Sequence, residues 1–150
     1  MDPYTYRQLS AFDVEPLKQL LVVFGVAFGE IQRHLTYTPD ESHVRALLSR
    51  PHIIALVAER GDEVVGGLIA YELEKFEKKK SEIYLYDLAV ANAHRRLGIA
   101  SRLIEELRAI ARERGVQDIF VQADRGDKAA IKLYENFGQS EEPFHFDINR

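Results

Sequence analysis

The stretch RRLGIA at residues 95–100 combines residue types that suit anion binding. It lies between an apolar, strand-like segment and a segment with helical spacing, so its N–H groups belong to the start of a helix. Those groups lack intrahelical partners, and the helix dipole adds positive charge there. Gly98 allows a turn and a close approach to a ligand, while Arg95 and Arg96 add cationic donors. An ordinary tight turn would use the same glycine, so this stretch alone leaves both interpretations open.

A second feature is the broken alternation of SEIYLYDLAV at residues 81–90. Its aliphatic side chains keep one strand parity up to Leu85 and the opposite parity from Leu88 onward. One extra residue at Tyr86 and Asp87 explains both the change of phase and the carboxylate in an apolar strand. Such bulges are frequent next to active sites. The alternative is that the strand ends at Asp87, although the following residues continue without Gly or Pro.

Composition limits the classes of protein to which this chain can belong. With 150 residues, 46% of them hydrophobic, the chain suits one domain, residues 1–150, with one sizeable core. The absence of cysteine excludes disulfides, thiolate metal sites and cysteine catalysis, and we expect no metal site. The N-terminus does not resemble a signal peptide, and no apolar run approaches the length of a membrane span. We therefore expect a soluble, cytoplasmic protein without a membrane partner.

Charge gives information about ligands. The net charge of −4, from 20 basic and 24 acidic residues, argues against nucleic acid as a partner. Residues 91–116 contain six arginines and three acids, whereas residues 117–150 contain seven acids and four basic residues. Solvated helix faces explain part of this asymmetry. The remainder suits an anionic ligand near the first segment and a cationic one near the second.

The elements that must position these residues can be predicted from periodicity and from terminal signals. In the N-terminal half we predict a strand, a helix capped by Asp13, a second helix that begins in a Thr38–Glu41 capping box, and a hairpin that turns at Gly61. The corresponding ranges are 4–9, 14–30, 38–48, 52–60 and 63–76.

In the C-terminal half, helical spacing continues from residue 101 to Gly115, which is a typical helix stop. We predict a strand at 116–124, a helix from Asp127 to Gly138, and a last strand at 143–148. The whole order predicts one mixed α/β sheet with helices on both faces.

The motif R-x-x-G-x-A after a strand, followed by AAIKLYENFG at 129–138, resembles the GNAT acyltransferase superfamily over about residues 4–148. This resemblance implies acetyl-CoA as cofactor. It also implies a mixed, mostly antiparallel sheet that splays between strands 81–90 and 116–124. The loop would bind the coenzyme A pyrophosphate, and the strand before it would pair with the pantetheine arm. The implied cofactor-binding residues are Leu88, Ala89, Val90, Arg95, Arg96, Leu97, Gly98, Ile99, Ala100, Ser101, Asp127 and Tyr134.

The resemblance also implies roles in catalysis. Tyr134 would protonate the leaving thiolate, unless it is simply a core tyrosine. Asp87, next to Tyr86, would take a proton from the acceptor amine directly or through water, help that is typically worth about 10²- to 10⁴-fold. An aspartate with an ordinary pKa near 4 is a poor base, so Asp87 would also orient the amine, while amides at the bulge polarise the thioester carbonyl. Where many family members have Asn, this chain has Asp127, which accepts but cannot donate.

Several short stretches of the sequence resemble the aminoglycoside 3-N-acetyltransferases of the GNAT type. Among them are KFE, SEIYLYDLAV, HRRLGIA, VQAD and HFDI. This implies a small polycationic amine as substrate, antibiotic inactivation, Tyr86 and Asp87 near the amine, and compatibility with a homodimer. His145 is expected in the core, and Asp127 is as good a helix cap as a ligand. The other candidate acceptor ligands are Glu30, Glu82, Asp124 and Asp147. Two alternatives remain: an acetyltransferase for another polyamine or a protein N-terminus, and a non-catalytic acyl-CoA sensor.

Overall fold

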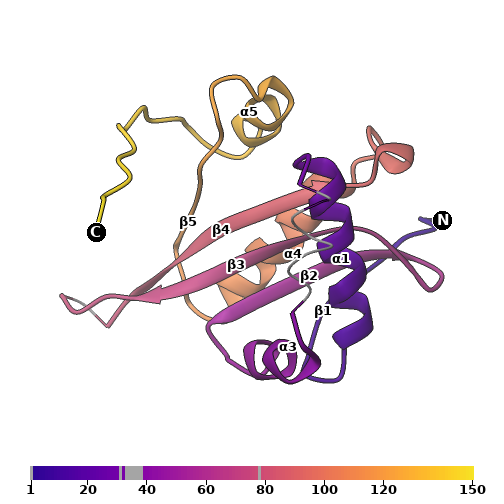
Figure 1. Ribbon diagram of the computed structural model, residues 1–150. Coiled ribbons are helices and arrows are strands. Elements are labelled where there is room, and N and C mark those ends of the chain that lie inside the picture. The colour runs from indigo at the N-terminus through magenta and orange to yellow at the C-terminus, as the bar shows by residue number, and fades with distance from the viewer. Residues whose placement is uncertain (1, 31, 33–38, 78) are drawn as a thin grey trace.

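The computed structural model describes residues 2–30, 32, 39–77 and 79–150 (Figure 1). The elements follow in the order β1 (Thr5–Gln8), α1 (Val14–Ala27), α3 (Glu41–Leu48), β2 (Ile53–Arg60), β3 (Glu63–Glu74), β4 (Ser81–Val90), a short 3-10 turn (Asn92–His94), α4 (Ile99–Glu113), β5 (Asp118–Val121) and α5 (Lys128–Glu135). In this part of the chain, no helix has the length and apolar character needed to cross a bilayer.

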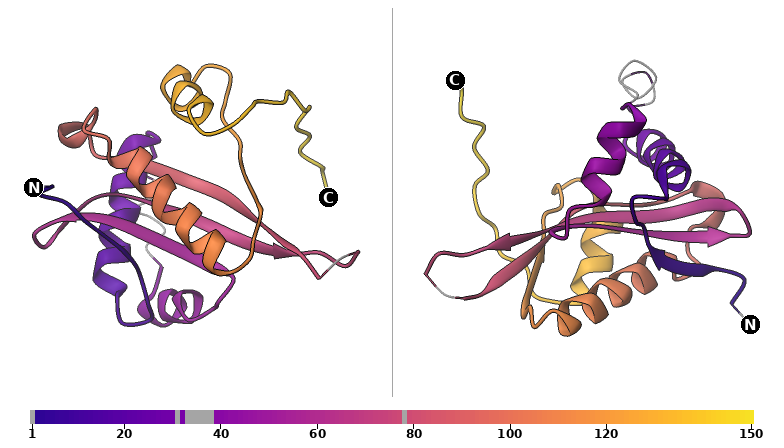
Figure 2. Two further views of the ribbon diagram at one scale, coloured as in Figure 1. Left: turned by 180° about the vertical axis from the view of Figure 1, so that it is seen from behind. Right: turned by 90° about the horizontal axis from the view of Figure 1, so that it is seen from below.

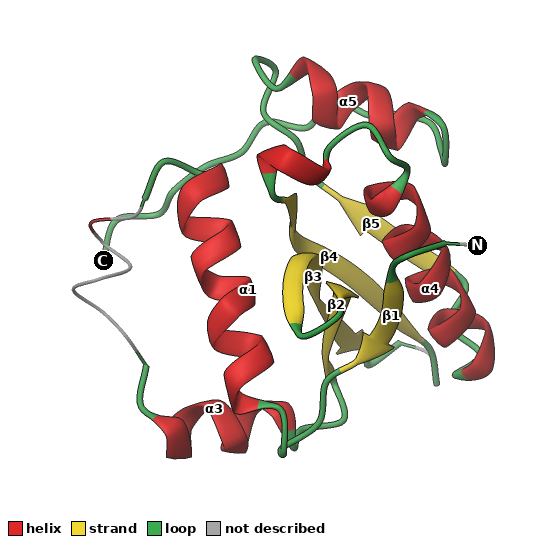
Figure 3. Ribbon diagram, turned by 90° about the vertical axis from the view of Figure 1, so that its right-hand side faces the viewer, coloured by secondary structure: helices red, strands yellow, loops and turns green. Residues whose placement is uncertain are grey.

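The strands form one sheet in the order β1-β2-β3-β4-β5. Neighbours are antiparallel except for β4 and β5, which run parallel. Helices α1 and α3 cover one face of the sheet and α4 covers the other (Figures 2 and 3). The predicted mixed, mostly antiparallel sheet with helices on both faces is therefore confirmed.

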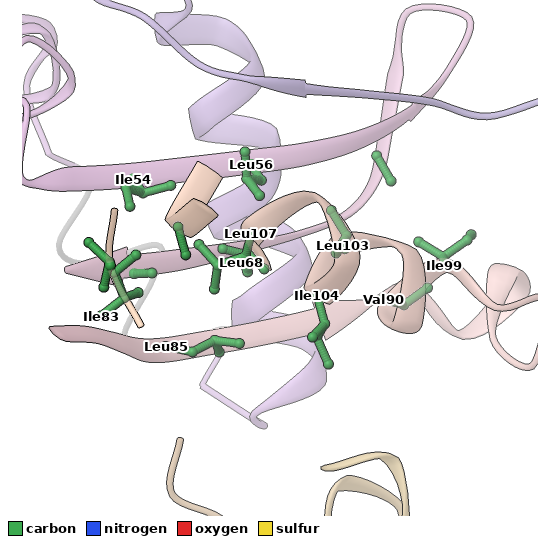
Figure 4. Close-up of a cluster of buried hydrophobic side chains, with 14 of the residues drawn as sticks. Ile54, Leu56, Leu68, Ile83, Leu85, Val90, Ile99, Leu103, Ile104 and Leu107 are labelled. Carbon is green, nitrogen blue, oxygen red and sulfur yellow. The ribbon is translucent and has the colours of Figure 1, made fainter. Parts of the chain in front are cut away.

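Each face of the sheet has its own apolar core. On the α4 face, side chains of β2, β3 and β4 meet the buried side of α4 (Figure 4). On the α1 face, α1 packs against alternate residues of β2 and β3 and against the end of β4. Gly67 permits this contact, because a Cβ there would lie 2.5 Å from the Leu56 carbonyl oxygen and 2.6 Å from the Leu20 side chain.

Two predicted helix starts need correction. Asp13 does precede α1, but its carboxylate accepts hydrogen bonds from the Ser10 amide (2.7 Å) and from Arg7 (2.9 Å), not from the helix. Helix α3 is capped by Asp40, whose carboxylate accepts from the His43 amide at 2.7 Å. An aspartate such as Asp40 is a stronger N-cap than the threonine that was predicted. Thr38, the expected cap, lies outside the described residues.

The predicted last strand at 143–148 is wrong, because the described residues after α5 form no strand. This tail, residues 139–150, leaves the body of the molecule (Figure 1), and Phe144, Phe146 and Ile148 are 88%, 78% and 92% exposed. His145, expected in the core, is also exposed and lies 3.1 Å from Asp147. A strand needs a neighbour for its backbone hydrogen bonds, and among the described residues of this chain the tail has none.

Candidate active site

The change of phase in β4 is a bulge. Ile69 of β3 pairs with Asp87, whereas the next residue, Ala70, pairs with Leu85. Within the described β3–β4 ladder, Tyr86 is therefore the extra residue. The prediction of a bulge at Tyr86 and Asp87 is confirmed, and the alternative in which the strand ends at Asp87 is excluded.

The bulge turns Tyr86 and Asp87 to the same face of the sheet. Asp87 stands opposite Ile69, which packs against the core under α1. The Tyr86 ring makes edge contacts with Tyr71 and Tyr84, at centroid distances of 5.7 and 5.4 Å. Tyr71 and Tyr84 are themselves cross-strand partners on this face. A regular strand would have sent one member of the Tyr86–Asp87 pair to the opposite face.

Asp87 lies in an environment that favours its protonated form. Its partial burial raises the pKa of the carboxyl, and the nearby negative charge of Glu30 raises it further. The structure thus brings together two of the predicted acceptor ligands. It also corrects the expectation of an ordinary aspartate, since a carboxylate with a raised pKa is a better general base.

Tyr134 of α5 lies near the same carboxylate. Burial raises the pKa of Tyr134 to about 12, and the charges of Asp127 and Asp87 add to this effect. The ring packs against the core on the α4 face, close to where β5 leaves the sheet. The β4–β5 pairing ends at Leu85 and Val121, so the predicted splay begins just before Asp87. A tyrosine with so high a pKa keeps its proton and can donate it.

The predicted phosphate loop has the expected backbone. Gly98 adopts φ +82° immediately before α4, and Arg96 adopts φ +63°. No side chain in the described chain caps the first amides of α4, so these donors suit an anion. Arg95 is directed elsewhere, since its Nε donates to the Val90 carbonyl at 3.1 Å and ties the loop to the strand end. The residues present therefore fit a coenzyme A pyrophosphate.

A groove of about 410 Å³ adjoins this loop. It lies between α1, which contributes Val22 and Val26, and the chain after β4, which contributes Asn92 and Arg95. The groove is mostly apolar and is not at Asp87. It lies beside the C-terminal end of β4, next to the loop where the cofactor is expected.

The other predicted acceptor ligands are dispersed. Glu82 lies five residues from Asp87, or roughly 16 Å along the strand at about 3.3 Å per residue. Asp127 caps α5 by accepting from the Ala130 amide at 3.1 Å, and the Asp124 carbonyl accepts from the Asp127 amide at 2.9 Å. Asp147 lies in the exposed tail. Within one chain, the structure does not bring these acids to Asp87 as it does Glu30.

Two tyrosines beside Asp87 were not among the residues predicted from the sequence. Burial raises the pKa of both Tyr71 and Tyr84, and the charge of Asp87 adds to each effect, so both rings lie near the carboxylate. Tyr84 could have been found from the sequence, because it is two residues from Tyr86 on the predicted strand and so shares its face. Tyr71, however, could be added only from the strand register, which the sequence did not specify.

Comparison with known proteins identifies the family of this chain. Residues 19–139 match the Acetyltransferase (GNAT) family, and the chain belongs to that family. N-acetyltransferase 8B of Rattus norvegicus is 32% identical over 82 residues, which are 55% of this chain and 37% of that protein. The chain thus matches less than two-fifths of the length of this curated relative.

Two solved structures match almost the whole chain. The aminoglycoside acetyltransferase HMB0005 from an uncultured soil metagenomic sample is 47% identical, with a TM-score of 0.95 over 100% of this chain and 99% of that one. The aminoglycoside acetyltransferase meta-AAC0020, also from an uncultured soil metagenomic sample, is 30% identical, with a TM-score of 0.90 over 98% and 96%. It has been solved in complex with trehalose and with sisomicin. The chain therefore carries an acetyltransferase domain of the GNAT family, and members of that family use acetyl-CoA.

Proposed function

We propose that this protein acetylates the 3-amine of the 2-deoxystreptamine ring of aminoglycosides and so inactivates these antibiotics in the cytoplasm. The observation that carries the proposal is the bulge, which holds Asp87 beside Glu30 and places Tyr86 next to it. Two negative groups with aromatic neighbours suit a polycationic amine. The 47% identity to an aminoglycoside acetyltransferase along the whole chain supports the same substrate class.

In the proposed mechanism, acetyl-CoA supplies an acetyl thioester. Asp87 accepts a proton from the acceptor ammonium, which frees the nitrogen lone pair for attack on the thioester carbon. With acetyl-CoA bound, a C–N bond would form as the C–S bond breaks, and Tyr134 would donate its proton to the departing sulfur. The new amide nitrogen would lose its remaining excess proton to solvent, and the Tyr134 phenolate would regain a proton from solvent. Amides at the Tyr86–Asp87 bulge stabilise the developing oxyanion, and Tyr86 orients the amine.

The cofactor contacts in this proposal come from two neighbouring segments. Backbone amides of residues 95–101 hold the pyrophosphate at the start of α4. The β4 residues 88–90 lie beyond the last β4–β5 pair, so that edge is open to the pantetheine arm. Asp127 contributes its backbone, because its carboxylate is occupied as the cap of α5.

Acceptor binding beyond Asp87 and Glu30 is assigned to Glu82, Asp124 and Asp147. For Asp147 we propose that the tail reaches the acceptor site of a second copy of the chain. In the tail, Phe144, Phe146 and Ile148 alternate like one face of a strand, and all three are exposed. β5 is an edge strand of the described sheet. A homodimer in which the tails pair with the partner's sheet would bury these side chains.

Product mapping tests the proposal directly. The purified protein is incubated with acetyl-CoA and an aminoglycoside that contains 2-deoxystreptamine, and the acetylated nitrogen is identified by NMR. Acetylation at the 3-amine is expected, together with raised resistance in a sensitive bacterium that expresses the protein. Turnover of spermidine or peptides without any aminoglycoside turnover would favour another GNAT activity. Binding of acetyl-CoA without turnover of any amine would favour an acyl-CoA sensor.

A further inference from the structure

Three aromatic side chains form a row across the sheet beside Asp87. Tyr71 of β3 pairs with Tyr84 of β4, and Tyr84 pairs with Phe120 of β5, so all three project from the face that carries Asp87. The rings of Tyr84 and Phe120 are stacked, with centroids 4.6 Å apart and planes 17° apart. Tyr86 joins the row to Asp87 through its contacts with Tyr71 and Tyr84.

This row is not part of the folding core. In the described chain, Tyr71, Tyr84 and Phe120 belong to neither of the two apolar clusters. Tyr86 is 58% exposed and Phe120 is 37% exposed. Contiguous exposed apolar surface of this kind marks a binding site more often than scattered surface residues do.

The surroundings of the row select a cationic ring as its ligand. Asp87 and Glu30 place negative charge at one end, and Glu82 lies on β4 two residues from Tyr84 at the other. Aromatic faces attract ammonium groups and pack against the C–H faces of saturated rings. The Tyr84 hydroxyl donates to Gln122 Oε1 at 2.8 Å, while the face of its ring stacks on Phe120.

The position of the row determines which part of the acceptor it meets. Tyr84 is three residues from Asp87, up to about 10 Å along the strand. A ring whose amine reacts at Asp87 does not reach Phe120, but a ring linked to it does. We propose that Tyr84 and Phe120 bind a second amino-sugar ring of a polycationic oligosaccharide acceptor; this inference rests on the proposed function.

The experiment compares two acceptors, a multi-ring aminoglycoside and free 2-deoxystreptamine, and measures the ratio of their kcat/KM values. Phe120→Leu should lower this ratio by about tenfold, because only the multi-ring acceptor uses the row. Tyr84→Leu should do the same, and Tyr84→Phe, which keeps the ring, should retain the ratio within about twofold. Phe12→Leu is the matched control, since Phe12 is 90% exposed in the turn before α1. It should leave the ratio at the wild-type value.

An unchanged ratio in Phe120→Leu and Tyr84→Leu would overturn the subsite, as would equal losses for both acceptors. Calorimetric titration with the multi-ring aminoglycoside separates this inference from the proposed function. If the wild type binds that compound without acetylating it, the proposed function fails. In that case a tenfold weaker Kd in Phe120→Leu still supports the subsite, and an unchanged Kd overturns it. Absence of binding by the wild type overturns both.

Discussion

Tyr134 and Asp87 lie within electrostatic reach of each other, although the two side chains belong to different layers of the molecule: burial raises the pKa of Tyr134, and the charges of Asp127 and then Asp87 add to that effect. Tyr134 packs with the α4-face core, whereas Asp87 projects from the face under α1. They can influence each other because β5 separates from β4 after Leu85, which leaves the edge of β4 open near Asp87. The proposed base and the proposed acid therefore both lie near the splay, on different sides of the sheet.

Replacing Asp87 with Asn tests the base. The substitution is nearly isosteric but removes the proton acceptor, so kcat should fall about tenfold or more while the KM for acetyl-CoA stays nearly constant. Steady-state kinetics checks this. Asp62→Asn, in the β2–β3 turn, should behave like the wild type. Unchanged kcat in Asp87→Asn would remove Asp87 from the mechanism.

The same variant should not lose stability. The pKa of Asp87 is raised in the folded protein, so its ionised form is disfavoured there relative to the unfolded chain. Stability from this group is greatest at low pH and declines as pH rises through the folded-state pKa. Asn carries no charge to desolvate, so the Tm at pH 7 should equal or exceed that of the wild type. Low kcat then cannot be attributed to unfolding.

Glu30→Gln tests the acidic neighbour. Because Glu30 helps to raise the pKa of Asp87, neutralising it should lower that pKa, while the remaining burial keeps it above the usual aspartate value. An NMR titration of the Asp87 carboxyl carbon measures the change without relying on activity. Glu41→Gln, at the exposed start of α3, should not move the Asp87 titration. An Asp87 pKa that does not fall in Glu30→Gln would contradict the proximity of the two acids.

Tyr134→Phe tests the acid. Loss of the hydroxyl should lower kcat by about tenfold, in the range that general-acid help provides. The wild-type Tyr134 remains protonated below its pKa of about 12, so kcat should not decline through its titration up to about pH 10. Tyr6→Phe on β1 is a control for the loss of a tyrosine hydroxyl outside the site. An alkaline loss of kcat near pH 9 that disappears in Tyr134→Phe would contradict so high a pKa.

Sequence alone predicted most of this arrangement, because the relevant signals are local. The parity change located the bulge, and the glycine before a helical run located the left-handed turn at Gly98 that precedes α4. The conformation of the tail does not depend on local sequence alone. The alternation of Phe144, Phe146 and Ile148 indicates a strand, but a strand also needs the edge of a neighbouring strand. Tyr71 was missed for a related reason, since its place beside Tyr86 depends on the register between β3 and β4.

Gly98→Val should weaken acetyl-CoA binding. At φ +82° a β-branched residue is strained by roughly 1–2 kcal/mol, and the loop would shift its amides to relieve that strain. The KM and Kd for acetyl-CoA should rise about tenfold with a smaller change in kcat. Gly115→Val is a matched control, because Gly115 has φ +70° at the opposite end of α4. It should cost similar stability while normal acetyl-CoA affinity is kept, and normal affinity in Gly98→Val would undo the loop assignment.

Removing the tail should convert a dimer into a monomer. Fully burying a large apolar side chain contributes about 1.5–3 kcal/mol of stabilising free energy. Three such side chains from each copy are therefore expected to stabilise a dimer in which each tail packs on the partner's sheet. Light scattering of the full chain at tens of micromolar should give twice the mass of one chain, and a variant that ends at Glu142 should give one. His145→Ser, on the opposite parity of the tail, should remain dimeric. A full chain that is monomeric at these concentrations, or a truncated chain that stays dimeric, would contradict the tail-mediated dimer.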